Sequence, residues 1–322
     1  MNSKVFQNIL KLTKFEMKKI LGMKKIVFLI GIFAVCVVAY SQVLENNDLN
    51  SWKSKAVEQQ EMLNEAASTM EEDADTLDAT DQYLNESFEQ LNTKIQFCLD
   101  NDILYGAQSV WTFIYNARFL LGMIIILQII LSGNIISIER ESKTWEKINV
   151  NEKSIGKIFL SKVLTVFSCT AIFSVIAYLI LGLTGAVLFG KSQYCFVAEE
   201  IRGVYTKLNC FNSMIGYVVA FFSVCLFYSF CAMLLETLFS SQKIVSVVLV
   251  VAFLFNGTLL NLAERLHMTK ILPFSYLDLN NYVKGIYSEN FGLNMAYLIL
   301  ISIILLLANY NVLKIKKKRL SH

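Results

Sequence analysis

The sequence predicts an all-α polytopic membrane protein with six transmembrane helices, an N-terminal interfacial helix and an extracellular helical hairpin between the first two spans. Two observations carry this prediction. Of the 322 residues, 55% are hydrophobic and 17% are charged, and the apolar residues are concentrated in long runs. Six of these runs reach about 20 residues or more. A helix of that length crosses the hydrocarbon core of ~30 Å, since it rises about 1.5 Å per residue.

The six predicted spans contain no Asp, Glu, Lys or Arg, as the cost of placing charge in lipid requires. They are Ile26–Leu44, Phe119–Ile138, Val163–Phe189, Phe211–Leu235, Ile244–Ala263 and Leu293–Leu313. Six buried helices of a soluble domain would need polar faces, which these runs lack. A cleaved signal peptide is disfavoured for the first run, because 25 residues precede it and it exceeds the length of a signal core.

Lysine and arginine gather in three segments: before the first span, after the second and after the sixth. Such segments stay in the cytoplasm, and an even number of spans places all three on one side. We therefore expect a multi-pass protein of the cell (plasma) membrane with cytoplasmic N- and C-termini. The net charge of +3 conceals this polarity. Because the lysines flank spans, nucleic acid is not an expected partner, whereas the lipid bilayer is.

Residues 1–25 form the predicted cytoplasmic segment, which contains an amphipathic helix over residues 4–22. Lys11, Lys14 and Lys18 share one face of that helix. Its apolar face consists of Val5, Phe6, Ile9, Leu10, Met17, Ile20 and Leu21. Such a helix lies in the membrane interface with its lysines toward anionic headgroups. Two roles stay open: an anchor for the span at residues 26–44, or a lever linked to a cytoplasmic partner.

Residues 45–110 form the predicted extracellular acidic domain, with fifteen acidic residues against three lysines. An apolar stripe at nearly heptad spacing predicts helices. It comprises Leu63, Ala67, Met70, Ala74, Leu77, Leu84, Phe88, Leu91 and Ile95. A hairpin turning around Leu77–Asp81 fits better than one helix, because ~40 helical residues would extend ~60 Å while both ends return to the bilayer. The acidic face is either a solvated surface or an attractor for cationic cargo.

The remaining spans occupy residues 111–313, and residues 314–322 form a basic cytoplasmic tail. The outer loops are Gly190–Cys210 and Glu264–Gly292, the second of which holds the single proline, Pro273. Cys195 and Cys210 bracket the first of these loops, where an oxidising environment would allow them to pair. The sequence leaves their pairing undecided.

Chemistry-bearing motifs are sparse, and no catalytic residue is predicted. There is no P-loop, no Cys/His cluster for a metal and no resident cofactor to expect. The lack of charge within the spans disfavours an ion-coupled carrier. Polar residues within spans are Gln128, Asn134, Asn256, Asn261, Asn309 and Asn311. Hydrogen bonding between helices is their default role, and Gln128 and Asn256 are the candidates for lining a substrate path.

The cytoplasmic loop after the second span, residues 139–157, carries the most specific pattern. Ser137, Glu139 and Arg140 end the span, Lys143 and Thr144 follow, and a lysine at 162 enters the third span. This pattern resembles the signature loop of ABC type-2 transporter permeases. Two departures are visible: Lys143 stands where the family commonly has Gly, and Asn149–Asn151 replaces its proline break. The resemblance extends to the interfacial helix, the six spans and the Pro-aromatic stretch before the last span.

The resemblance implies the fold of the ABCG-like (type V) exporters and the permease half of an ATP-driven exporter. ATP and Mg would belong to a separate nucleotide-binding ATPase subunit, and a second permease chain would complete a homo- or heterodimer. The cargo would be a hydrophobic or amphipathic compound: an antimicrobial peptide, a drug or a lipid. The residues expected to couple to the ATPase are Glu139, Arg140, Glu141, Thr144, Trp145, Glu146 and Lys147. The alternative is a non-transporting membrane sensor or scaffold whose extracellular hairpin binds a ligand or partner.

Overall fold

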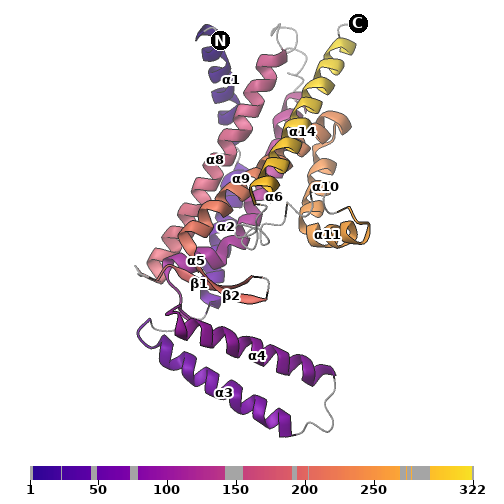
Figure 1. Ribbon diagram of the computed structural model, residues 1–322. Coiled ribbons are helices and arrows are strands. Elements are labelled where there is room, and N and C mark those ends of the chain that lie inside the picture. Colours follow the sequence, from indigo (N-terminus) through magenta and orange to yellow (C-terminus); the bar gives the residue numbers. More distant parts are fainter. Residues whose placement is uncertain are drawn as a thin grey trace. The chain divides into compact units, whose positions relative to one another are not determined.

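The computed structural model describes residues 3–22, 24–44, 49–72, 79–141, 155–190, 194–201, 203–268, 273, 277 and 291–320. The chain divides into two compact units. The first unit comprises Met1–Cys36, Phe119–Leu179 and Gly216–His322, and the second comprises Val37–Arg118 and Ile180–Ile215. Helices make up most of the described chain, as the sequence predicts (Figure 1).

Five helical stretches of the described residues are long and apolar enough to cross a membrane. A bent pair of helices adds a sixth if the pair is one span. The helices that carry these stretches are α2 (Lys24–Val43), α5 (Val110–Asn116) with η2 (Ala117–Leu121) and α6 (Gly122–Glu141), α8 (Ile155–Leu188), α9 (Cys210–Phe239) and α14 (Phe291–Leu320). The predicted membrane protein is therefore supported, with five or six spans.

The predicted span Ile244–Ala263 is not one straight helix. It is divided into α10 (Gln242–Leu254) and α11 (Asn256–Arg265), which meet at an angle of 68°. Asn256 and Gly257 begin α11, and an Asn-Gly pair favours a turn because both residues are poor helix formers. This pair was the signal in the sequence for the break.

Several helices extend beyond the predicted apolar runs and take charged residues with them. α8 begins at Ile155, eight residues before the predicted start at Val163 (163 − 155 = 8), so Lys162 lies inside the helix. α9 continues past the predicted end at Leu235 and includes Glu236. Both charged side chains are buried. The uncharged spans of the prediction are thus the central parts of longer helices that carry charge near their ends.

In the first unit, α6 packs along α10 through small residues. A Cβ added at Gly122 would lie 3.2 Å from the ring of Phe253, and one at Gly133 would lie 3.5 Å from Cγ of Gln242. Small residues of this kind let helix backbones approach closely in membranes. A side chain at Gly122 would require the Phe253 ring to shift by a few tenths of an ångström, whereas one at Gly133 would make an ordinary van der Waals contact.

In the second unit, α3 (Trp52–Glu72) and α4 (Ala79–Asp100) lie side by side as a helical hairpin (Figure 1). Its core contains Trp52 and Ile95, packed against Leu63 and Leu91 of the predicted stripe. Amide side chains add Gln60–Gln96 and Asn64–Asn92 hydrogen bonds across the hairpin. Of the predicted turn at Leu77–Asp81, residues 77–78 lie outside the described residues, and Ala79–Asp81 already belong to α4.

The second unit also contains a β-hairpin, so the all-α prediction is incomplete. β1 (Phe196–Ile201) pairs antiparallel with β2 (Val204–Asn209), in a register that runs from Phe196↔Asn209 to Ile201↔Val204 (Figure 1). Gly203 has φ +80° in the two-residue turn, a conformation that glycine adopts without strain. The strands fall in the predicted outer loop Gly190–Cys210, where short runs such as Val204–Lys207 are too brief for periodicity to separate strand from loop.

Candidate functional site

The residues predicted to couple to an ATPase lie at and beyond the end of α6. Glu139, Arg140 and Glu141 form its last turn, and their side chains are outside the described part of the chain. Thr144, Trp145, Glu146 and Lys147 lie in residues 142–154, also outside the described residues. Their role in coupling stays a prediction.

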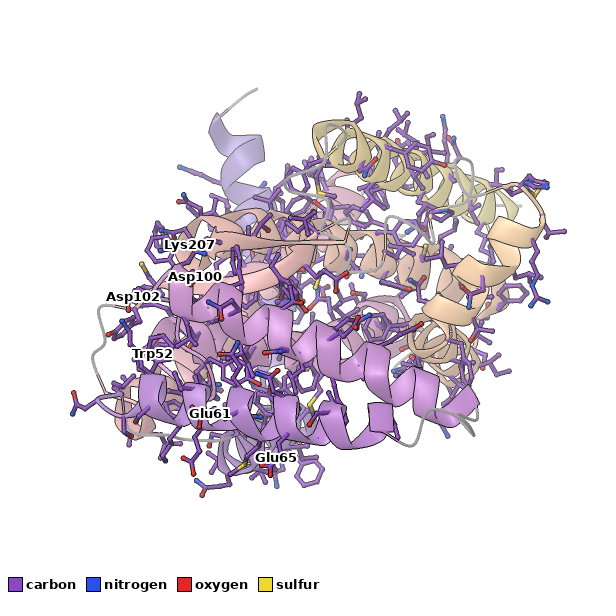
Figure 2. All side chains as sticks on the ribbon, turned by 60° about the horizontal axis from the view of Figure 1, so that its bottom comes forward. Trp52, Glu61, Glu65, Asp100, Asp102 and Lys207 are labelled. Carbon is purple, nitrogen blue, oxygen red and sulfur yellow. The ribbon has the colours of Figure 1, made fainter. Side chains whose placement is uncertain are left out.

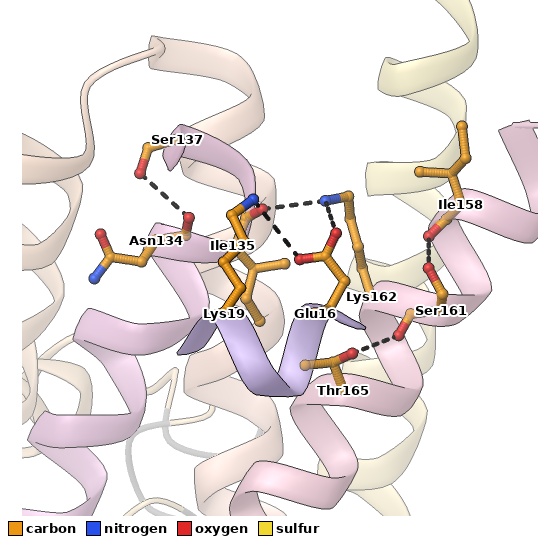
Figure 3. A network of polar contacts seen from close by, with 9 residues as sticks. All are labelled: Glu16, Lys19, Asn134, Ile135, Ser137, Ile158, Ser161, Lys162 and Thr165. Atoms are coloured by element: carbon orange, nitrogen blue, oxygen red, sulfur yellow. Dashed lines mark hydrogen bonds and ion pairs between the residues drawn. The ribbon is translucent and has the colours of Figure 1, made fainter. Parts of the chain in front are cut away.

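Lys162 is the centre of a polar network next to this loop (Figure 3). Its Nζ donates a hydrogen bond to the carbonyl oxygen of Ile135 at 3.1 Å and lies 3.9 Å from Oε1 of Glu16. The Lys162 side chain is 1% exposed and that of Glu16 is 9% exposed. A buried charge is costly unless it is paired and hydrogen-bonded, so these two contacts are what make this position tolerable for lysine.

The network joins three helices that are distant in sequence. Glu16 belongs to α1 (Ser3–Leu21), Ile135 to α6 and Lys162 to α8. Lys19 lies 3.9 Å from the other carboxylate oxygen of Glu16, so the carboxylate stands between two ammonium groups. The helix that enters the 139–157 loop and the helix that leaves it are therefore linked directly, and α1 is attached to both.

The buried face of α1 differs from the predicted apolar face. Ile9, Thr13, Glu16 and Ile20 are buried, whereas Leu10 is 46% exposed. Their spacing of four, three and four residues follows one side of a helix, and that side passes through Glu16 rather than through Leu10. Contact of α1 with α6 and α8 therefore decides which residues are buried.

Glu16 is the member of this network that sequence reasoning missed. It is the only acidic residue among the first 25, in a segment with seven lysines. A single carboxylate in a basic amphipathic helix was the available signal. Hydrophobic periodicity treats it as part of the polar face, and only packing reveals its partner.

Gln128 lies where α6 meets α8 and is 1% exposed. Its Nε2 donates a hydrogen bond to Oγ1 of Thr170 at 2.7 Å. The Thr170 hydroxyl in turn donates to the carbonyl oxygen of Val166 at 2.9 Å. This is the interhelical hydrogen bond expected as the default role, and lining a substrate path stays a prediction for Gln128.

Asn256 is 8% exposed and is the first residue of α11, directly after the 68° bend. Gln128 belongs to α6 and bonds to Thr170 of α8, whereas Asn256 belongs to α11. Asn256 lies at a break in an apolar helix, and at such a break backbone polar groups become accessible. That position keeps Asn256 a candidate for the substrate path.

A second polar contact ties α9 to α14. Oγ1 of Thr237 lies 3.0 Å from Oδ1 of Asn309, and Nζ of Lys316 donates to the carbonyl oxygen of Thr237. Asn309 is 2% exposed, and Glu236, adjacent to Thr237, is fully buried. The last helix is thus held to α9 by hydrogen bonds close to the basic tail.

In the second unit, Glu199 of β1 connects the β-hairpin to α5. Its carboxylate accepts a hydrogen bond from the Tyr115 hydroxyl at 2.9 Å and lies 3.3 Å from the Arg118 guanidinium. Arg118 also stacks on the Tyr115 ring, with Cζ 3.9 Å from its centroid. Ser109 caps α5 and donates to the carbonyl oxygen of Tyr194 at 2.7 Å. Three polar contacts therefore hold β1 and the residues before it to α5 and η2.

A polar cavity of about 210 Å³ lies beside Glu199. Its wall includes Lys94 and Cys98 of α4, together with Gln108 and Asn116. Burial raises the pKa of the Cys98 thiol to about 11, with Lys94 acting weakly in the opposite direction. Cys98 is therefore a protonated, unreactive thiol at neutral pH.

Near the C-terminal end of α4, charged side chains come together from α3, from β2 and from Asp102, which follows α4 (Figure 2). Lys53 of α3 forms an exposed ion pair of 2.6 Å with Asp102, and Lys207 of β2 donates to the carbonyl oxygen of Asn101 at 2.7 Å. Among the described residues, no group of three or more His, Cys, Asp or Glu side chains could hold a metal ion.

The fold and these contacts define a mostly helical protein with five or six apolar helices of membrane-spanning length. The chain belongs to the family described as "Protein of unknown function (DUF2705)", whose model matches residues 79–320. The match starts at the first residue of α4 and therefore includes Lys162 but not Glu16. No curated protein and no solved structure matches the chain.

Proposed function

We propose that this chain is the permease subunit of an ATP-binding cassette exporter, which moves a hydrophobic or amphipathic cargo outward while a separate subunit hydrolyses ATP. The observation that carries the proposal is the Lys162 contact with Ile135 and Glu16. It links the two ends of the 139–157 loop to each other and to α1. The loop itself resembles the signature loop described above.

A force applied to a loop moves the spans only if the loop's ends are held rigidly. Ile135 lies about one turn before Glu139, and Lys162 lies about two turns after Ile155, where α8 begins. The hydrogen bond between them prevents the two helix ends from separating when the loop is pushed. Glu16 makes α1 a part of the same body, which favours the lever over the simple anchor.

The proposed topology has six spans, both termini in the cytoplasm and the α3–α4 hairpin outside. Basic residues before α2 and at the end of α14 favour the same side for both termini, and this requires an even number of crossings. The bent pair α10 and α11 then counts as one crossing. α10 alone is about 20 Å long, shorter than the hydrocarbon core, so α11 completes the passage.

Six spans would form half of a transport path, with a second permease chain forming the other half. Apolar residues on α10 and α14 are exposed in the single chain, including Val247, Val248, Ile303 and Ile304. Such surfaces require lipid or a second chain to cover them. We propose that the second chain covers part of this surface and lipid the rest.

The second candidate is a membrane sensor, and one observation favours it. A hollow of about 620 Å³ between α4 and the β-hairpin is lined by Glu89, Phe97, Glu200 and Tyr205. This volume is in the range of small-molecule sites, and carboxylates beside aromatic rings suit a cationic ligand. A sensor would need this hollow but no ATPase.

Purification from the native host in a gentle detergent separates the two candidates. An exporter should co-elute with a P-loop protein in stoichiometric amount and show vanadate-sensitive ATP hydrolysis. The matched variants are Lys162→Met and Lys19→Met. Lys162→Met should retain the partner but lose most export, whereas Lys19→Met should behave as wild type. A chain that elutes alone in several detergents, without ATPase activity, would refute the exporter and leave the sensor.

A further inference from the structure

The register of the β-hairpin places Cys195 directly opposite Cys210. The last pair of the ladder is Phe196↔Asn209, and the next positions outward are the two cysteines. The backbone N–H of Cys210 donates to the carbonyl oxygen of Cys195 at 2.7 Å, so the pairing continues to this point. The sequence could only show that these cysteines bracket a segment.

This arrangement has the geometry that a disulfide requires. Directly opposed, hydrogen-bonded residues of an antiparallel pair have Cα atoms about 5.5 Å apart. Disulfide-bonded cysteines most often have the same Cα separation, about 5.5–6 Å. Both thiols are free in the structure, and a small local adjustment would bring their Cβ atoms from about 4.5–5.5 Å to the about 4.5 Å or less of a disulfide. We propose that Cys195 and Cys210 form a disulfide that closes the open end of the β-hairpin. The inference rests on the proposed topology, in which this hairpin lies outside the cell.

The two thiols differ in accessibility, and this sets the order of the reaction. Cys195 is partly exposed, whereas Cys210 is buried. The thiolate of Cys195 attacks one sulfur of a disulfide oxidant outside the membrane and releases the other as a thiolate. The thiolate of Cys210 then attacks the Cys195 sulfur and releases the second thiolate. The pair loses two electrons and two protons, and the oxidant's disulfide becomes two thiols.

The other five cysteines do not offer such a pair. Cys36, Cys169, Cys225 and Cys231 lie inside the helical stretches of membrane-spanning length, whereas Cys210 is the first residue of such a stretch and so lies at its end. Cys98 lies in α4, away from the β1–β2 ladder that places Cys195 and Cys210 opposite each other. Cys195 and Cys210 are adjacent in a ladder outside the apolar cores, where an oxidant can reach the exposed partner.

The disulfide would fix a strand that already has polar anchors. Glu199 of β1 contacts Tyr115 and Arg118, and the carbonyl oxygen of Tyr194 accepts from Ser109. Closing the hairpin at Cys195 would hold β1 in register, and with it the Glu199 carboxylate at its place against α5. Reduction should therefore loosen the hairpin first.

The test is peptide mapping of the full-length protein from intact cells, with free thiols blocked by N-ethylmaleimide before lysis. We expect one cross-linked product that joins the Cys195 and Cys210 peptides, lighter by two hydrogens than their sum and lost on reduction. Cys195→Ser and Cys210→Ser should each leave the remaining cysteine as a free thiol, which maleimide labels at once for Cys195 and after denaturation for the buried Cys210. Cys231→Ser is the matched control and should leave the product unchanged. Blocked, uncross-linked peptides in the wild type would overturn the proposal.

A membrane-impermeant maleimide distinguishes this failure from failure of the topology. If Cys195 is labelled from outside without a reductant, the disulfide is refuted while the proposed topology stands. If it is labelled only after the cells are permeabilised, the topology and the disulfide fail together. As a check on folding, a reductant should lower the melting temperature of the wild type but not that of the Cys195→Ser/Cys210→Ser variant.

Discussion

The ammonium group of Lys162 lies 3.9 Å from the carboxylate of Glu16, so a helix at the start of the chain is paired with the beginning of α8. Both groups are largely buried, and Lys162 also donates to Ile135 of α6. Lys162 is a charged residue at a buried position that an apolar side chain could also fill. The charged residue orients three helices around one loop, which an apolar side chain could not do through hydrogen bonds or ion pairs.

Lys162→Met should destabilise the first unit by about 3 kcal/mol, because it leaves the Glu16 carboxylate buried without this partner. Thermal unfolding in detergent would measure the loss. The double variant Glu16→Gln/Lys162→Met should recover part of it, since no buried carboxylate is then left without Lys162, and the neighbouring ammonium group of Lys19 is more exposed. Lys19→Met is the control, because Lys19 is more exposed and should change little. Equal melting temperatures for all variants would show that the pair has no structural role.

Gln128→Leu and Thr170→Val remove the two partners of the hydrogen bond between α6 and α8. A double-mutant cycle should give a coupling energy of about 0.6–1.7 kcal/mol, the range found between membrane helices. Ser161→Ala in place of Thr170→Val should give almost none, because the Ser161 hydroxyl donates within its own helix. If Gln128→Leu alters export selectivity while the coupling energy is near zero, the result favours Gln128 as a residue of the substrate path over its role as a hydrogen bond between α6 and α8.

Trp52→Ala should unfold the α3–α4 hairpin locally. Trp52 is 2% exposed in the hairpin core, and truncating a buried tryptophan costs about 3–5 kcal/mol. Hydrogen exchange of the full-length protein should show lost protection in α3 and α4, with the amides of α8 unchanged. Tyr83→Ala is the matched aromatic control, since Tyr83 is 71% exposed. Retained protection in Trp52→Ala would mean that the hairpin is held by other contacts.

Cys98 should react slowly with iodoacetamide in the folded protein. Its pKa is raised from 9.0 to about 11, so at pH 8 the reactive thiolate is about 100-fold scarcer than for an ordinary cysteine. The rate should rise about tenfold per pH unit toward pH 10 and reach its ordinary value after unfolding in detergent and urea. Mass spectrometry of the Cys98 peptide measures the rate. Fast alkylation at pH 8 in the folded state would contradict the burial of this thiol.

The sequence by itself determined the apolar helices and the hairpin. A long run without charge can satisfy its backbone in lipid only as a helix, and this depends on composition within one segment. The stripe through Leu63, Leu91 and Ile95 predicted the α3–α4 core for a similar reason, because its spacing is local. The Asn256–Gly257 break was also present as a local signal, but it was weaker than the apolar run around it.

Only the tertiary structure decided the contacts between distant segments. The pairing of Glu16 with Lys162 and the position of Cys195 opposite Cys210 each depend on where the chain returns in space. Hydrophobic periodicity reports which face of a segment is buried, but it carries no information on which distant residue the face meets. A buried charge is tolerated only when its partner arrives, and strand pairing is fixed only when two strands meet. These features therefore belong to the fold as a whole.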